Sequence, residues 1–139
     1  MNVPLIAAGS LALLGAAIHG GVGEVLVVRR LSPNVLPSTR LGGGGFTKTM
    51  IRATWHITTV AFISVGSALV FAGILHGDTA HRIGILAAAT NTGFAAVIWG
   101  SALAQGVDSA RRGNWRPFRH PAPALFVVGV ALAWWGVAS

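Results

Sequence analysis

Four long apolar stretches constrain this chain more than any other feature of its sequence. They cover residues 4–28, 53–75, 83–107 and 122–138. As a helix, the first would rise about 37 Å, which is enough to cross a bilayer core of about 30 Å. Strands of a membrane barrel would instead appear as short segments of alternating polarity. The sequence therefore predicts an all-α integral membrane four-helix bundle, with residues 1–139 forming a single transmembrane domain.

Composition supports a membrane protein. Only 9% of the 139 residues are charged and 53% are hydrophobic, whereas about 25% of a typical soluble domain is charged. There is too little charge to cover a surface that faces water. The chain has no cysteine, which excludes disulfides, iron–sulfur clusters and thiolate metal sites. Abundant alanine, glycine and arginine indicate a GC-rich bacterial genome.

The basic residues predict the orientation of the helices. Two of the three connections carry nearly all of them, namely Arg29, Arg30, Arg40, Lys48 and Arg52, and then Arg111, Arg112, Arg116 and Arg119. The middle connection holds only Arg82, and the terminal segments hold none. Because positive loops stay in the cytoplasm, we expect antiparallel helices, both termini outside, and a multi-pass protein of the bacterial inner (cytoplasmic) membrane. The net charge of +7 then reflects contact with anionic lipid headgroups rather than nucleic-acid binding.

Three ionisable side chains fall inside the apolar stretches, near their cytoplasmic ends. They are His19, Glu24 and His56. Such residues are costly in a membrane and mark function. Imidazole together with carboxylate suits a transition metal, so all three are candidate metal ligands. In an α-helix, however, His19 and Glu24 would lie about 140° apart around the helix axis. This separation argues against the binding of one metal ion by both residues.

The same residues fit two further kinds of site. His19 and His56 could be the axial ligands of haem b between facing helices, although their expected depths differ by about 7 Å. Alternatively, a histidine and Glu24 could form a proton or quinone site. A purely structural interpretation competes with these: the histidines hydrogen-bond across helices, and Glu24 pairs with Arg29, Arg52 or an arginine of the second basic loop. No catalytic residue is assigned, since no nucleophile triad or phosphate loop occurs.

Several other residues are interpreted as packing elements. Six glycines at helical spacing are expected to let helices approach closely: Gly15, Gly23, Gly66, Gly73, Gly93 and Gly100. Asn91 is expected to bridge helices and Trp99 to pack between them. Trp55, Trp115, Trp134 and Trp135 fall at expected membrane interfaces. The connection 29–50, which contains prolines and a run of glycines, is a linker, a lid or a docking segment.

Two short motifs carry a resemblance. Residues 19–24 read His-Gly-Gly-Val-Gly-Glu, and residues 55–58 read Trp-His-Ile-Thr. The chain resembles a group of uncharacterised bacterial four-span inner-membrane proteins that pair His-x-x-x-Gly-Glu in the first span with Trp-His-[Ile/Leu]-[Thr/Ser] in the second. The resemblance covers the whole chain. It implies the same topology and one shared site containing His19, Glu24, Trp55 and His56, but it brings no activity.

The leading functional hypothesis is a small polytopic inner-membrane protein with an intramembrane His/Glu polar site on the cytoplasmic side. That site would bind a metal or haem, or carry protons. Two alternatives belong to other classes. One is an accessory structural subunit of a larger respiratory, photosynthetic or transport complex. The other is a homo-oligomeric transporter or channel, which would need polar residues along a continuous path, and the outer halves of the spans offer few.

Overall fold

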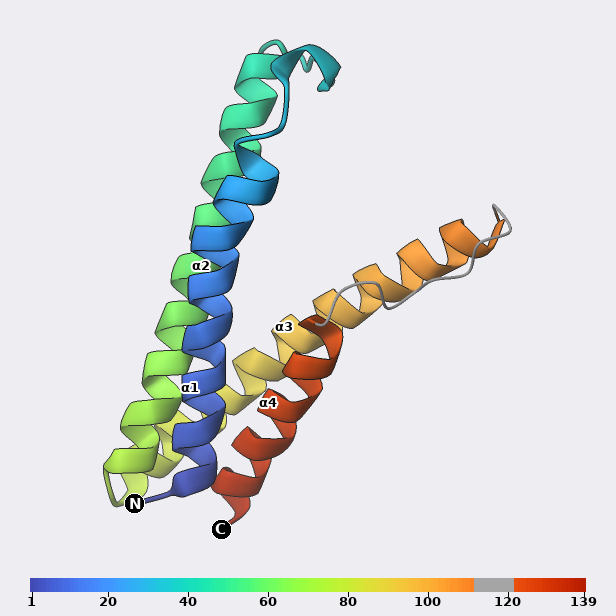
Figure 1. The fold of residues 1–139 in the computed structure, drawn as a ribbon. Coiled ribbons are helices and arrows are strands. Elements are labelled where there is room, and N and C mark those ends of the chain that lie inside the picture. The colour runs from blue at the N-terminus through green and yellow to red at the C-terminus, as the bar shows by residue number, and fades with distance from the viewer. Residues whose placement is uncertain (112–121) are drawn as a thin grey trace. The chain divides into compact units, whose positions relative to one another are not determined.

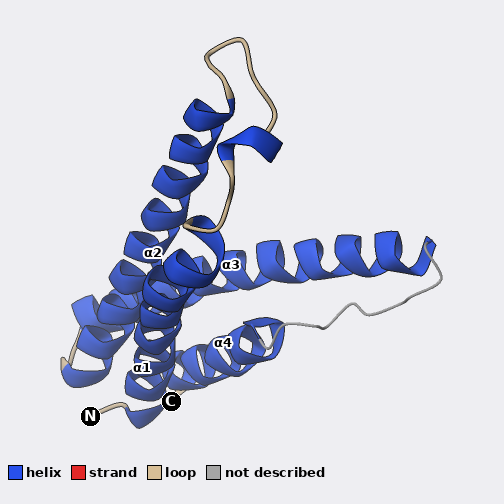
Figure 2. Cartoon of the chain, turned by 45° about the horizontal axis from the view of Figure 1, so that its top comes forward, coloured by secondary structure: helices blue, strands red, loops and turns tan. Residues whose placement is uncertain are grey.

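The structure is a computed structural model that describes residues 1–111 and 122–139, and its regular secondary structure in those ranges is helical (Figures 1 and 2). The elements in chain order are α1 (Val3–Ala17), the π-helix η1 (Ile18–Val28), the short 3₁₀ helix η2 (Pro33–Val35), α2 (Gly44–Ile74), α3 (Asp78–Arg111) and α4 (Ala122–Ala138). The predicted all-helical class is confirmed. The residues Arg112, Trp115, Arg116 and Arg119, for which the sequence predicted roles, lie outside the described residues.

Three of the helical segments are long and apolar enough to cross a membrane. They are Val3–Val28, Gly44–Ile74 and Asp78–Arg111. The apolar helix α4 has 17 residues, which corresponds to about 25 Å of rise. Helix α2 begins at Gly44, so the end of the connection expected at 29–50 is helical. Once a helix is nucleated, each further residue adds a backbone hydrogen bond, and α2 therefore continues beyond its apolar stretch.

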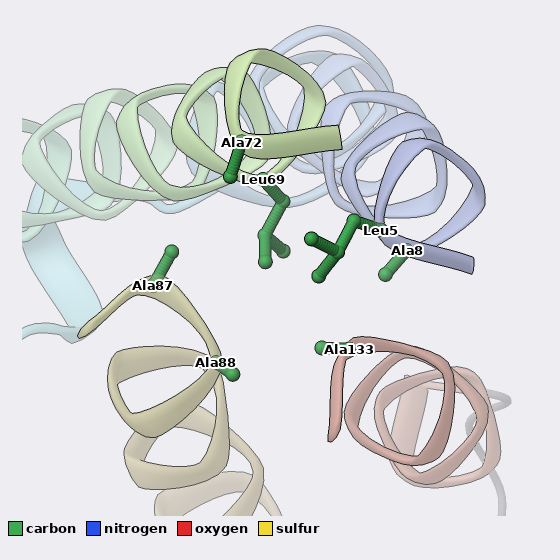
Figure 3. Close-up of a cluster of buried hydrophobic side chains, with 7 residues drawn as sticks. All are labelled: Leu5, Ala8, Leu69, Ala72, Ala87, Ala88 and Ala133. Atoms are coloured by element: carbon green, nitrogen blue, oxygen red, sulfur yellow. The ribbon is translucent and has the colours of Figure 1, made fainter. Parts of the chain in front are cut away.

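The described chain divides into two compact units. Unit 1 comprises Met1–Leu11 and Val65–Ser139, and unit 2 comprises Ala12–Ser64. The core of unit 1 contains two leucines and five alanines: Leu5, Ala8, Leu69, Ala72, Ala87, Ala88 and Ala133 (Figure 3). Alanine adds little bulk between helix backbones, so the helices of this unit pack at short range.

Some of the predicted packing glycines lie in close contacts, and others do not. A Cβ added to Gly73 would approach Ile6 to 2.7 Å, and one added to Gly9 would lie 2.6 Å from the carbonyl oxygen of Gly66. Gly15, Gly93 and Gly100, in contrast, have no neighbouring atom of the described residues within 4 Å of an added Cβ. The packing prediction is wrong for these three, because helical spacing alone does not say which face meets a neighbour.

Both chain ends and the turn between α2 and α3 meet at one end of unit 1. The Asn2 backbone N–H donates to Gly73 O at 2.7 Å, and its side-chain amide donates to Gly136 O at 2.6 Å. Gly77 has a φ of +91°, a conformation that favours glycine, and it forms the tight turn before α3. This arrangement requires the two ends of the chain to share one side of unit 1.

Helices α3 and α4 are joined by tryptophan hydrogen bonds. Trp99 Nε1 donates to Pro123 O at 3.2 Å, and Trp134 Nε1 donates to Thr92 Oγ1 at 3.0 Å. Asn91 is buried, and a Cβ on Gly129 of α4 would lie 3.5 Å from its amide nitrogen. The expected packing of Trp99 between helices is confirmed.

Candidate functional site

The π-helix η1 brings His19 and Glu24 to the same side of their helix. In a π-helix the backbone hydrogen bonds run from residue i to i+5, and the Arg29 N–H continues this pattern by donating to Glu24 O at 2.9 Å. Side chains five residues apart therefore lie nearly one above the other. The expected separation of about 140° is wrong because it assumed α-helical geometry. π-helical turns occur frequently at functional sites.

One face of α2 supplies the partners of these two residues. Arg52 lies three and four residues before Trp55 and His56, and Thr59 lies four and three residues after them, which places these side chains on one face of an α-helix. All four contact or approach residues of η1 within unit 2. The candidate site is therefore formed by η1 and this α2 face (Figure 1).

His19 is held by two aromatic rings and two hydrogen bonds. Its ring stacks on Trp55 with a centroid distance of 4.1 Å and an interplanar angle of 11°, while Phe62 meets it edge-on at 5.5 Å. Trp55 Nε1 donates to His19 O at 2.9 Å. His19 Nδ1 lies 3.0 Å from Thr59 Oγ1. These contacts fix both the position and the rotation of the imidazole.

The hydroxyl of Thr59 also determines the tautomer of His19. Thr59 Oγ1 donates its single proton to Trp55 O at 3.1 Å. It must therefore accept a hydrogen bond from His19, so Nδ1 carries a proton. In the neutral imidazole this leaves a lone pair on Nε2. Sequence reasoning missed Thr59 and Phe62, although their spacing from Trp55 along α2 was a usable signal.

Glu24 occupies the centre of a charged cluster. Its side chain is only 7% exposed. Its Oε1 forms ion pairs with Arg52 Nη2 at 2.8 Å and with Arg29 Nε at 3.4 Å. The other oxygen, Oε2, lies 3.4 Å from His56 Nε2 and has no hydrogen-bond partner in the part of the chain that the structure describes. The predicted pairing of Glu24 with Arg29 and Arg52 is confirmed.

The two arginines make the burial of Glu24 tolerable. Removing an isolated carboxylate from water costs several kcal/mol of desolvation free energy, and nearby opposite charges offset this cost only when their geometry is good. Both guanidinium groups converge on Oε1, and their own side chains stay more than half exposed, at 64% for Arg29 and 54% for Arg52. Glu24 is thus neutralised on one oxygen while the other faces His56.

The cluster fits a metal ion poorly. Within residues 1–111 and 122–139, no group of three or more His, Cys, Asp or Glu side chains could hold one. A divalent cation near Glu24 would also meet two guanidinium groups, whose repulsion is strong at such distances. For haem, His56 Nε2 would need an open coordination position, and in this structure it faces the Glu24 carboxylate.

Comparisons with known proteins give no further information about the function of this cluster. No family model, curated protein or solved structure matches it. The chemistry of the cluster must therefore be derived from its own contacts. Those contacts join a carboxylate, an imidazole and two guanidinium groups at one end of the helix pair formed by η1 and α2.

Proposed function

We propose that this chain is a four-span protein of the bacterial inner membrane whose Glu24–His56 pair exchanges a proton with the cytoplasmic side. The observation that carries the proposal is Oε2 of Glu24. It is buried, lacks a hydrogen-bond partner among the described residues, and lies 3.4 Å from His56 Nε2. A carboxylate oxygen opposite an imidazole nitrogen is a pair that can share one proton.

The placement in the membrane has two supports. Three helical segments are long and apolar enough to span, and α4, with 17 residues, lies at the lower limit of the usual range for a spanning helix. In unit 1, both chain ends lie beside the α2–α3 turn, as an even number of spans requires. With basic connections in the cytoplasm, this end of unit 1 faces outside.

The arrangement of charges supports proton exchange over metal binding. The two arginines occupy Oε1 of Glu24 and leave Oε2 to His56. The side chain of His56 is 45% exposed, so its ring is accessible to water or lipid headgroups while its Nε2 faces the buried carboxylate. An imidazole ring can accept a proton at one nitrogen and donate one from the other. His56 can therefore pass a proton between the surface and Glu24.

The test is infrared difference spectroscopy of the purified protein in nanodiscs during acidification. The band that is lost in Glu24→Gln reports the carboxyl group of Glu24. We expect the acid-induced infrared difference at the Glu24 band to differ between the wild type and His56→Gln, because this substitution replaces the imidazole that faces Oε2. His81→Gln, at the start of α3 in unit 1, is the matched control and leaves that band unchanged.

Two results would refute the proposal. If the acid-induced infrared difference at the Glu24 band is the same in His56→Gln as in the wild type, Glu24 serves only to anchor the arginines. If the purified protein shows a haem spectrum or a stoichiometric metal that is lost in His19→Ala and His56→Ala, the site holds a cofactor instead. Because His56 is half-exposed, His56→Gln preserves the fold, and size-exclusion chromatography checks this.

A further inference from the structure

Three basic side chains converge where η1 ends and α2 begins. Arg29 and Arg52 both contact Oε1 of Glu24, at 3.4 and 2.8 Å. Lys48 Nζ donates to Arg29 O at 3.3 Å, so its ammonium group lies beside the same segment. Against these three positive charges, Glu24 supplies one negative charge. The cluster therefore keeps a surplus of two positive charges at the surface.

The donors of this cluster are only partly used. A guanidinium group has five N–H donors in a planar fork that matches the oxygens of a phosphate, and an ammonium group has three. Glu24 holds the two guanidinium groups together from the buried side, while most of each side chain remains exposed. The cluster is thus preorganised for an anion that approaches from outside.

The segment between η1 and α2, which links Arg29 to the helix that carries Lys48 and Arg52, contains exposed apolar side chains. It folds back on the first turn of α2, since Thr47 Oγ1 donates to Pro37 O at 2.7 Å and Gly44 packs directly on Pro33 O. In this folded segment Val35 is 78% exposed and Leu41 is 81% exposed. Exposed apolar side chains beside basic ones are typical of segments that lie in the headgroup region of an anionic leaflet.

We propose that Arg29, Lys48 and Arg52 bind the phosphate group of an anionic phospholipid in the cytoplasmic leaflet, with Val35 and Leu41 inserted beside it. The inference rests on the membrane placement proposed above, but not on proton exchange by Glu24 and His56. The apolar contacts distinguish a lipid from free phosphate, because only a lipid surface provides a partner for Val35 and Leu41.

The test measures lipid binding by native mass spectrometry of the full-length protein in a zwitterionic detergent. Phosphatidylglycerol is titrated against the wild type, Lys48→Gln and Arg30→Gln. A basic residue near an anionic surface contributes enough to change affinity about fivefold, so Lys48→Gln should weaken phosphatidylglycerol binding by about that factor. Arg30→Gln removes the same charge from the neighbouring segment, but among the described residues the Arg30 side chain has no hydrogen bond or ion pair to the cluster, whereas Lys48 bonds to Arg29 O. Arg30→Gln should therefore weaken binding less. Phosphatidylcholine should bind more weakly than phosphatidylglycerol to all three.

Each other outcome overturns the lipid site. If Lys48→Gln and Arg30→Gln lose the same amount of phosphatidylglycerol affinity, the lipid is held by diffuse electrostatic attraction rather than at a defined site. Inorganic phosphate that displaces phosphatidylglycerol and binds as tightly would identify free phosphate as the ligand. Because Lys48 does not contact Glu24, the acid-induced infrared difference at the Glu24 band should be the same in Lys48→Gln as in the wild type. Failure of the lipid site and failure of proton exchange are thereby distinguished. A chain that stays soluble without detergent would remove the membrane premise of both.

Discussion

Gly23 is the position where one added methyl group should disturb the site most. A Cβ at Gly23 would lie 2.5 Å from Cζ2 of Trp55, whereas ordinary van der Waals contact begins near 3.4 Å. In Gly23→Ala the indole ring must therefore withdraw by about 0.9 Å, the difference between these two distances. That ring is stacked on His19 and donates a hydrogen bond to the His19 carbonyl oxygen. Moving the ring therefore weakens both the stacking contact and the hydrogen bond.

The expected magnitude follows from these two contributions. Overpacking a close contact costs about 1–3 kcal/mol, and losing one hydrogen bond costs about 0.5–1.5 kcal/mol. Gly23→Ala should therefore lower the free energy of unfolding by about 1.5–4.5 kcal/mol. The measurement is an SDS titration of the protein in mixed micelles, followed by tryptophan fluorescence.

Gly21→Ala is the matched control in the same π-helix. No atom lies within 4 Å of a Cβ at Gly21, and alanine is favoured over glycine in helices by up to about 1 kcal/mol. The unfolding free energy of Gly21→Ala should therefore equal or slightly exceed that of the wild type. If Gly23→Ala unfolds at the same SDS fraction as Gly21→Ala, the contact between η1 and Trp55 is not the one described here, and the reasoning fails.

Two further predictions follow from contacts elsewhere in the chain. Thr92→Val removes the acceptor of the Trp134 hydrogen bond and should lower the free energy of unfolding by about 1 kcal/mol, as measured by the same SDS titration. Thr90→Val is the control, because the Thr90 hydroxyl donates to Leu86 O within α3, and it should change the free energy of unfolding less. Gly44→Ala places a methyl group against Pro33 O and should open the segment between η1 and α2, which limited proteolysis would detect as faster cleavage than in Gly45→Ala, where a Cβ meets no atom within 4 Å.

Part of the candidate site could be predicted from the sequence. Charged groups within apolar stretches are conspicuous because each is costly in a membrane, and this singled out His19, Glu24 and His56. The pairing of Glu24 with Arg29 and Arg52 was also predictable, since few other groups could neutralise it. Thr59 and Phe62 could not be singled out in this way, because a threonine or phenylalanine in an apolar stretch has no special cost.

Hydropathy and charge pattern alone determined that this chain is helical and where its apolar segments lie, because transfer free energies are properties of individual residues and add along the chain. The tertiary structure decided which side chains meet. The π-helical hydrogen bonds rotate Glu24 onto the side of His19, and the absence of a side chain at Gly23 lets Trp55 reach the imidazole. Both depend on backbone hydrogen bonding and close packing between segments far apart in sequence, which no local pattern encodes.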